Sequence, residues 1–456
     1  MVSNQNNDRL QTSIRTHPSF LNISQGTHVW MFSAIAELVD NSRDAKATTL
    51  DISVEDFYSK KDGKSIPMMA VIDDGHGMPH QEINKMLSLG HTMPDGDDPN
   101  YIGRFGVGFK TGAMRIGQDA IVITQTTNTR SIGFLSQSFN SGKDNLEVPI
   151  VSYRRQGSVM EVDTTAQSEA RANYNLAAIK DFSPFDEYFI GEKLGLFHGK
   201  VTGTQIYVWN LEKWGAGYFL EWKSGNNGNR SMDEGNILIR SRRLRSRPGK
   251  ISKQVPLDYS LRSYMEVIFL DPRMKIFVQG SLVKARPLAK SLHNTVVLNE
   301  TLMEKPVQLT LGRCQLEYER KNSGIFLYWH GRLIEAYKRV GNMAHNADTG
   351  RGVIGVIDVT NLMYNGKNVL VLNNKQGFQD CEEYAELEEW LSQKLDEYWD
   401  ENYDALDLGA ASELYKPDHE WVQCDKCRKW RILSSGFDNK MLPQEWYTFM
   451  SFFIII

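Results

Sequence analysis

Glu37-Leu38-Val39-Asp40-Asn41 is the first of three short stretches that decide the fold, and Asp73-Asp74-Gly75-His76-Gly77-Met78 and Gly103-Arg104-Phe105-Gly106-Val107-Gly108-Phe109-Lys110 follow it along the chain. Together they offer a carboxylate, a metal-binding amide, a base-reading acid and a glycine-rich loop. This set suits an ATP-hydrolysing site that has no Walker-type phosphate loop. Each stretch alone is weak support for a function, so the prediction depends on all three and on their order.

Residues 28–45 are predicted to form a helix, because Phe32, Ile35 and Val39 recur at helical spacing and make an apolar stripe. Glu37 and Asn41 lie on the other side, one turn apart, so their side chains are neighbours. A lone pair of this kind is usually a solvated polar face. Beside the other two stretches, it predicts that Glu37 accepts a proton from water and that Asn41 offers its carbonyl oxygen to Mg²⁺.

Residues 68–72 form a continuous apolar run, which predicts a strand buried on both faces. The run ends in an Asp-Gly turn, and such turns are common without any function. In the functional interpretation, Asp73 accepts the exocyclic amine of adenine. Gly75 and Gly77 let the base approach the backbone, and Met78 adds an adaptable apolar wall.

The segment before the third stretch is polar and contains Pro and Gly, so residues 91–100 are predicted to be a mobile loop. The glycine-rich stretch leads from this loop into a short helix beginning at Thr111. Successive backbone N–H groups that lead into a helix form an anion site. We therefore expect a phosphate cradle at residues 103–110, with the preceding loop acting as a lid over the triphosphate.

The three stretches resemble the N, G1 and G2 boxes of the GHKL ATPases, the group that includes gyrase B, Hsp90 and MutL, and Gly203-Thr204-Gln205-Ile206 resembles the G3 box. Within this group the chain is similar to the MORC proteins. The longer strings that carry this similarity are residues 28–41, 85–90, 110–121, 331–334 and 373–376. The resemblance runs over residues 19–431.

The resemblance implies an α+β protein in three parts. A GHKL (Bergerat) ATPase domain, an α/β sandwich, would cover residues 1–235, a ribosomal-S5-like transducer domain residues 236–405, and a linker with a partial CW-type zinc finger residues 406–456. Glu37 would be the general base, Asn41 the Mg²⁺ ligand, and Lys375 a second-domain residue that reaches the γ-phosphate. The other ATP-binding residues would be Asp73, Gly75, Gly77, Met78, Gly103, Arg104, Phe105, Gly106, Val107, Gly108, Phe109, Lys110 and Thr204.

The second domain shows a different pattern of elements. Residues 275–278 and 281–284 predict a hairpin with a short Gly-containing turn. Residues 325–329 and 353–359 are predicted strands, and residues 384–398 a helix rich in Glu and Trp. This order favours an α+β domain.

A basic run opens the second domain and consists of Arg240, Arg242, Arg243, Arg245, Arg247 and Lys250. It has two interpretations. The first four arginines could contact DNA phosphates, in which case affinity would fall steeply with salt. Alternatively, the run could be solvated charge on an edge strand that deters aggregation.

The stretch Trp421-Val-Gln-Cys424-Asp-Lys-Cys427-Arg-Lys-Trp430 resembles the opening of a CW-type zinc finger. Cys424 and Cys427 have the spacing that supplies half of a tetrahedral zinc site. Trp421 and Trp430 would be the aromatic walls of a methyl-lysine cage.

The rest of the finger departs from that pattern. The family expects a third Cys near Thr448 and a fourth later, whereas residues 449–456 are an apolar stretch. We therefore expect an incomplete site without tightly bound zinc in the monomeric chain, and a tail that arises by truncation or alternative splicing.

Composition limits the remaining possibilities. The 456 residues suit two or three domains, and a formal net charge of −4 makes no overall demand for nucleic acid or a membrane surface. Four cysteines do not make a disulfide framework and favour a reducing compartment. The N-terminus lacks the apolar core of a signal peptide, and the apolar C-terminal tail is too short to span a bilayer.

The resemblance implies a slow, Mg²⁺-dependent ATPase in the nucleus. ATP would gate the formation of a homodimer that clamps DNA or chromatin for silencing or compaction. A complete CW finger would add histone H3 tail recognition, which the incomplete one does not support. Two alternatives are a nucleotide-binding scaffold with negligible hydrolysis that recruits silencing partners, and another GHKL enzyme, for which the chain lacks the matching long strings.

Overall fold

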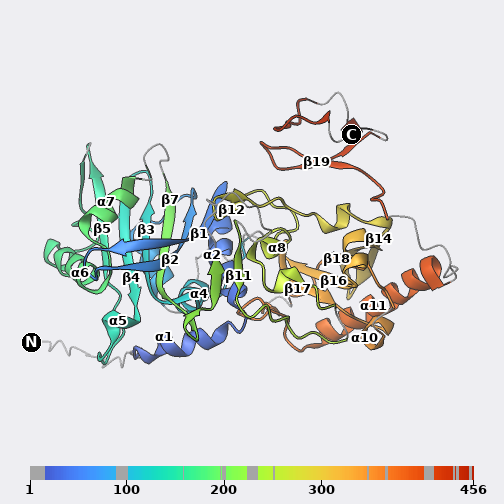
Figure 1. Ribbon diagram of the computed structural model, residues 1–456, viewed down its shortest axis with the longest axis horizontal. Helices are drawn as coiled ribbons and strands as arrows, with labels where there is room; N and C mark the ends of the chain where they lie inside the picture. Colours follow the sequence, from blue (N-terminus) through green and yellow to red (C-terminus); the bar gives the residue numbers. More distant parts are fainter. Residues whose placement is uncertain are drawn as a thin grey trace, which may run out of the picture.

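The computed structural model describes residues 16–88, 101–157, 159–195, 197, 202–222, 235–249, 252–346, 349–364, 368–404, 415–434, 437, 441–450 and 454–455. Two layered α/β domains lie side by side, and a small three-stranded sheet, β19-β20-β21, lies to one side of them near the C-terminus (Figure 1). The α+β fold with these three parts is the one predicted. Among the residues that are described, no helix has both the length and the apolar character that crossing a bilayer requires.

The first domain contains the helical elements α1 (Ser19–Ser24), η1 (Gln25–Thr27), α2 (Met31–Asp44), α3 (His80–Leu87), α4 (Gly108–Ile116), α5 (Gln137–Asn140), α6 (Glu169–Phe182) and α7 (Glu187–Gly195). Its strands are β1 (Thr49–Ser59), β2 (Lys64–Asp73), β3 (Gly117–Gln125), β4 (Thr129–Ser136), β5 (Ile150–Gln156), β6 (Val159–Val162), β7 (Gly203–Leu211), β8 (Lys213–Trp214), β9 (Gly217–Tyr218) and β10 (Leu220–Trp222).

The following segment contains β11 (Ile237–Ile239), η2 (Pro256–Asp258), α8 (Leu261–Met265), β12 (Lys275–Val278), β13 (Ser281–Leu282), η3 (Leu288–Lys290), β14 (His293–Leu302), β15 (Lys305–Arg313), α9 (Gln315–Glu319), β16 (Gly324–Trp329), β17 (Arg332–Lys338), α10 (Asn342–His345), β18 (Val353–Asp358), α11 (Glu382–Trp399) and η4 (Asp400–Asp404). The C-terminal strands are β19 (Trp421–Gln423), β20 (Trp430–Leu433) and β21 (Ile454–Ile455).

The central sheet of the first domain has nine strands in the order β13-β12-β1-β2-β7-β3-β4-β5-β6. Successive side chains of a strand point to opposite faces, and β2 shows the result. Met69 and Val71 join the core on the side of α2 and α4, while Met68 and Ala70 join the core on the side of α6 and α7. The apolar run at residues 68–72 is therefore buried on both faces, as predicted.

The predicted hairpin at residues 275–284 exists, but it belongs to the first sheet. Strand β12 pairs in parallel with β1, from Thr49 opposite Lys275 to Ile52 opposite Val278. It covers the edge of β1, whose backbone groups would otherwise be open to other strands. The sheet of the first domain therefore continues well past residue 235, where the sequence placed the domain boundary.

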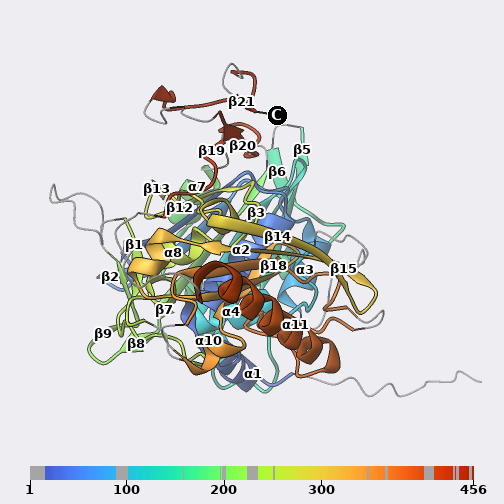
Figure 2. The same cartoon turned by 90° about the vertical axis from the view of Figure 1, so that its right-hand side faces the viewer.

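The second domain has a five-stranded sheet in the order β14-β15-β18-β16-β17, with β16 and β18 parallel. The predicted strands at residues 325–329 and 353–359 are β16 and β18, and the predicted helix at residues 384–398 is α11. Figure 2 shows α11 running across this sheet. Leu387, Leu391 and Leu395 recur every four residues along α11 and are buried.

Helix α2 lies between the two domains (Figure 1), and its apolar residues belong to one core that both domains share. Trp30, just before α2, donates a hydrogen bond from its indole nitrogen to the carbonyl oxygen of Asp258, at 2.8 Å. Its ring meets that of Tyr264 edge to face, with centroids 4.7 Å apart. The helix that was predicted to carry the catalytic carboxylate is thus fixed by both domains.

Candidate active site

A cavity of about 320 Å³ lies between α2, the turn after β2, the glycine-rich segment before α4 and a loop of the second domain. This volume is within the usual range for small-molecule sites. The predicted site residues along its wall are Glu37, Asn41, Asp73, Gly77, Met78, Gly103, Arg104, Phe105, Gly106, Gly108, Phe109, Lys110, Thr204 and Lys375. Gly75 and Val107 lie beside them in sequence but outside this lining. The predicted lid at residues 91–100 lies outside the described residues.

Asp73 ends β2 at one side of the cavity and is buried. Its carboxylate accepts hydrogen bonds from the backbone N–H of Gly75, at 2.8 Å, and from the Ser42 hydroxyl, at 2.9 Å. Thr204 lies opposite Asp73 on β7, and its hydroxyl is 3.1 Å from that of Thr124. Burial raises the pKa of Asp73, while these hydrogen bonds hold it back. The carboxylate is thereby fixed as an acceptor that faces the cavity.

Glycine is required at Gly77, in the turn that follows Asp73. Its φ is +70°, in the left-handed region, and a Cβ there would lie 2.0 Å from the carbonyl oxygen of Gln125. Both the backbone conformation and the close approach exclude other residues. This turn brings the neighbouring N–H of Met78 within 2.8 Å of the Thr124 hydroxyl.

Helix α4 begins at Gly108, directly against Glu37. A Cβ on Gly108 would lie 2.1 Å from the Glu37 carboxylate, so only glycine allows this approach. Gly106, with φ +63°, turns the chain into the helix. The first N–H groups of a helix have no intrahelical partners, and they favour an anion next to the Glu37 carboxylate.

Lys110, on the first turn of α4, is buried and donates a hydrogen bond from Nζ to the carbonyl oxygen of Met86, at 2.7 Å. Burial lowers the pKa of Lys110 to about 8. In this conformation the ammonium caps the end of α3. Contact between Lys110 and a phosphate stays a prediction.

Lys375 reaches the cavity from the second domain, as the resemblance implied. Its loop holds a φ of +52° at this residue, and the side chain is buried. Nζ donates to Glu37 Oε2, at 2.8 Å, and to Asp40 Oδ2, at 2.9 Å. Asp40 Oδ1 also accepts from Arg332 Nε, at 3.3 Å. Two carboxylates of α2 therefore face two cations of the second domain.

Burial and mutual charge set the ionisation of this cluster. Burial raises the pKa of Glu37, and the charge of Lys375 only partly opposes it. Burial alone would also raise the pKa of Asp40, but the charges of Arg332 and Lys375 hold it below its ordinary value. Within the described part of the chain, Glu37 Oε1 has no hydrogen-bond partner. A buried carboxylate with a raised pKa and one unpaired oxygen is a candidate general base.

Asp40, Arg332 and Asp44 are site residues that the sequence analysis missed. Asp44 accepts hydrogen bonds from the backbone N–H of Ile102, at 3.1 Å, and of Gly103, at 2.7 Å, and so fixes the start of the glycine-rich segment. Burial raises the pKa of Asp44 to about 6. The signal that could have found Asp40 and Asp44 is their spacing of three and seven residues from Glu37, which places them on the same side of the helix.

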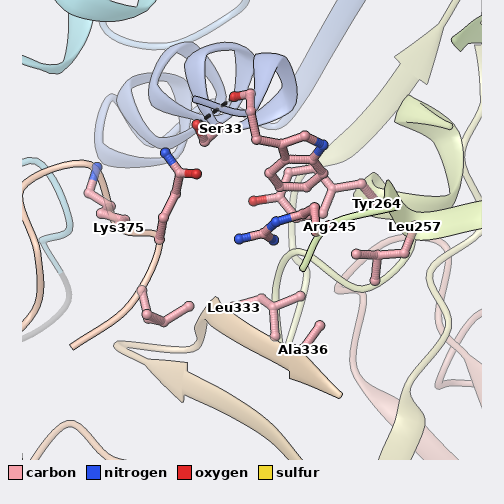
Figure 3. A pocket seen from close by; sticks show the side chains of 10 residues that line it. Ser33, Arg245, Leu257, Tyr264, Leu333, Ala336 and Lys375 are labelled. Atoms are coloured by element: carbon pink, nitrogen blue, oxygen red, sulfur yellow. Dashed lines mark hydrogen bonds between the residues drawn. The ribbon is translucent and has the colours of Figure 1, made fainter. Parts of the chain in front are cut away.

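A much smaller cavity of about 10 Å³ lies next to the Lys375 loop, between the two domains. Figure 3 shows Lys375 beside α2, with Arg245 and Tyr264 on one side and Leu333 and Ala336 of β17 below. A space of this size holds about one water molecule. The loop is thus packed closely between the domains.

The basic run is not a single surface. Arg240 and Arg242 pair with Glu221, at 3.1 and 2.8 Å, whereas the guanidinium of Arg245 lies 4.3 Å from the ring centroid of Trp30 in the domain interface. Arg243 is exposed. Arg247 turns inward to Asp258, and Lys250 lies outside the described residues. DNA contact by Arg240, Arg242 or Arg243 stays a prediction, but Arg245 does not share their surface.

The C-terminal segment brings Cys424 and Cys427 together in one turn after β19. The backbone N–H of Cys427 lies 3.5 Å from Cys424 Sγ, and Cys427 Sγ lies 3.6 Å from the Thr448 hydroxyl. Burial alone would raise the pKa of Cys424, but hydrogen bonds from Cys427 and Thr448 lower it to about 6. Among the residues described, no three His, Cys, Asp or Glu side chains gather as metal ligands. Two thiols and a hydroxyl do not fit the four-ligand set of structural zinc.

Trp421 and Trp430 lie on one face of the β19–β20 pair, because Trp421 faces Ile432 and Trp430 faces Gln423. The ammonium of Lys290, from the second domain, lies 5.0 Å from the ring centroid of Trp421. The aromatic faces can therefore hold a cation, although the methyl-lysine role stays a prediction.

Three family models match the chain. The model described as "Histidine kinase-, DNA gyrase B-, and HSP90-like ATPase" matches residues 29–168, and "Morc6 ribosomal protein S5 domain 2-like" matches residues 259–399. The "CW-type Zinc Finger" model matches residues 420–452, across the departure from its cysteine pattern.

Curated proteins match over most of the chain. MORC family CW-type zinc finger protein 3 of Mus musculus is 32% identical over 451 residues, which cover 94% of this chain and 44% of that protein. ATPase MORC2 of Homo sapiens is 25% identical over 95% of this chain and 50% of its own length. Protein MICRORCHIDIA 7 of Arabidopsis thaliana is 29% identical over 85% of this chain and 56% of its own length. The chain spans about half the length of these relatives.

Proposed function

Because the chain belongs to the MORC family, with a GHKL-type ATPase domain, an S5-like domain and a CW-type segment, we propose that it binds Mg²⁺ and ATP in the 320 Å³ cavity and hydrolyses the γ-phosphate. The observation that carries this proposal is Glu37. It is buried at the cavity wall, against the start of α4, with one carboxylate oxygen unpaired among the described residues. A water held between Glu37 and the helix start would be placed for attack on a terminal phosphoryl group.

The residues divide the work by position. Asp73 accepts the adenine amine, and the glycine-rich segment with the start of α4 donates backbone N–H groups to the phosphates. Mg²⁺, when bound, neutralises developing charge on the phosphate oxygens, and the Asn41 amide oxygen is the side chain placed to hold it. Glu37 orients water and takes its proton. Catalysis of this kind depends on positioning and charge neutralisation.

Lys375 connects hydrolysis to the second domain. It now bonds to Glu37 and Asp40, and in the ATP-bound state it moves to the γ-phosphate. That move frees Glu37 to act on water. Because Lys375 lies on a loop of the second domain, the arrangement of the two domains becomes sensitive to the presence of the γ-phosphate.

At the level of the whole protein, we propose that ATP gates formation of a homodimer in the nucleus that clamps DNA or chromatin for silencing or compaction. The family membership supports this role. Turnover is slow if dimer opening limits it. A histone H3 tail is a weaker partner for this chain, because its CW segment lacks a complete ligand set.

The test compares wild type with Glu37→Gln and Asn41→Ala in phosphate release, nucleotide binding and molecular mass with a non-hydrolysable ATP analogue. We expect Glu37→Gln to bind ATP but to release phosphate at least about 100-fold more slowly, because the general base is lost. The same variant should remain dimeric with ATP. Asn41→Ala should lose nucleotide binding. Normal turnover by Glu37→Gln would contradict the assignment.

One observation favours a second candidate, a nucleotide-binding scaffold with negligible hydrolysis that recruits silencing partners. Lys375 occupies Glu37 Oε2 and keeps the base from binding water through that oxygen. If Lys375 stays there with ATP bound, wild type and Glu37→Gln release phosphate equally slowly while both bind nucleotide. That result would select the scaffold.

A further inference from the structure

The starting point is the way Asp40 divides its carboxylate between two cations. Oδ2 accepts from Lys375 Nζ, at 2.9 Å, and Oδ1 from Arg332 Nε, at 3.3 Å. Asp40 is 0% exposed and Arg332 1% exposed, so neither can exchange its partner for water. The two residues are 292 positions apart and join α2 of the first domain to β17 of the second.

Arg332 is held in place independently of Lys375. It begins β17 and donates from Nη1 to the carbonyl oxygen of Leu333. Its guanidinium lies 6.0 Å from the ring centroid of Tyr264, which is itself buried. In contrast, Lys375 lies in a loop, where its backbone N–H donates a hydrogen bond to the carbonyl oxygen of Leu372. Both cations are almost wholly buried, but Arg332 belongs to a strand of the second-domain sheet and Lys375 to a loop. We therefore take the lysine as the cation that moves and the arginine as the one that stays.

We propose that Asp40 is a positioning residue for Lys375 and that Arg332 acts on Lys375 through Asp40. Asp40 holds Lys375 beside Glu37 in the nucleotide-free chain, and the Asp40–Arg332 ion pair stays in place when Lys375 moves to the γ-phosphate. This inference rests on the proposed function. The cluster contains two carboxylates and two cations, so departure of Lys375 without Arg332 would leave Asp40 buried and unpaired. Such a charge is strongly unfavourable. Arg332 removes that cost and makes the transfer of Lys375 reversible.

The first experiment needs no nucleotide. Hydrogen exchange is followed by mass spectrometry on the full chain, in the segment that contains Leu372 and Lys375. We expect Asp40→Asn to speed exchange there by about tenfold, because Lys375 then has one carboxylate instead of two. Arg332→Lys, which keeps the charge, should change exchange less than Arg332→Gln. Equal exchange in wild type, Asp40→Asn and Arg332→Gln would overturn the inference.

The matched control is Glu317→Gln. Glu317 is 0% exposed and accepts from Arg286, at 2.6 Å, inside the second domain. Glu317→Gln therefore removes a buried ion pair that does not touch the Lys375 loop, and it shows how such a loss alone changes stability and exchange. We expect Glu317→Gln to lower thermal stability but to leave the exchange of the Lys375 segment unchanged relative to β18 amides.

The second experiment separates positioning from simple stability. In steady-state ATP hydrolysis, Asp40→Asn and Arg332→Gln should lower kcat by about 10- to 100-fold, as expected for a misplaced group, while KM changes by less than about threefold. The double variant Asp40→Asn/Arg332→Gln restores charge balance, so it should regain thermal stability but not kcat. Recovery of both would reduce the pair to a structural role and overturn the inference.

The two proposals fail in distinguishable ways. If wild type neither binds nor hydrolyses ATP, the proposed function fails, and the hydrogen-exchange result still decides whether Asp40 and Arg332 hold Lys375. If wild type hydrolyses ATP through Glu37 and the Asp40 and Arg332 variants match it in kcat, only the positioning role fails.

Discussion

At the scale of single residues, Gly77 offers the sharpest test of the turn that follows Asp73 at the cavity wall. Gly77→Ala combines a left-handed φ of +70° with a contact of 2.0 Å to the Gln125 carbonyl oxygen. The backbone must shift, so we expect the free energy of unfolding to fall by at least about 2 kcal/mol. Urea denaturation measures this change.

Gly63→Ala is the control for that substitution. Gly63 has nearly the same φ, +61°, but a Cβ there meets nothing within 4 Å. Gly63→Ala should therefore lower the free energy of unfolding only by the cost of the left-handed backbone conformation, about 1 kcal/mol. If both variants lose the same free energy, the close approach at Gly77 has no energetic weight.

Residue types predicted the outline of the site but not its charge balance. Glu37 and Asp73 stood out because each follows a recognisable pattern, a helix face or a strand end. The role of Asp40 depends on Arg332, which is close only in the folded chain. Lys110 is a second residue whose contact the sequence did not predict. Its place in the glycine-rich stretch predicted a contact with phosphate, whereas in the folded chain its ammonium donates to the carbonyl oxygen of Met86.

At the scale of elements, the approach of α4 to α2 positions Glu37. Gly112 on α4 lies against the carbonyl oxygen of Ala34, where a Cβ would be 2.7 Å away. Gly112→Ala must push the helices apart, and we expect a loss of about 1 to 3 kcal/mol in stability together with reduced ATP hydrolysis. Thermal unfolding and phosphate release measure the two effects.

Gly191→Ala on α7 is the matched helical control. A Cβ at Gly191 meets nothing within 4 Å, so alanine should stabilise the helix by about 0.5 to 1 kcal/mol. Stabilisation by Gly112→Ala as well would show that α2 and α4 tolerate a wider spacing.

Periodicity predicted the elements well where it was strong. The helix expected at residues 28–45 is α2, Met31–Asp44, and the strand expected at residues 68–72 lies within β2. Periodicity could not assign β12 to a sheet, because the pattern of a hairpin does not show which sheet edge, far away in sequence, the hairpin joins. Parallel pairing with β1 is a property of the folded chain.

At the scale of the whole molecule, the apolar core runs from α2 into the sheet of the second domain without interruption. Interfaces between domains of one chain are usually smaller and more polar than a continuous apolar core of this kind. We therefore expect both domains to lose structure in one cooperative transition, which hydrogen exchange at low urea concentration can measure. Amides of β2 and β16 should open with the same free energy; a lower value for β16 would show that the domains unfold separately.

The parallel pairing of β12 with β1 also bears on how this protein can be divided for experiments. A fragment that stops at residue 235 would lack the strand that covers β1, from Thr49 to Ile52. Exposed strand edges recruit further strands from other molecules. A fragment in which the edge of β1 is covered must therefore extend through Leu282, and one with the complete wall of the 320 Å³ cavity must also contain Lys375.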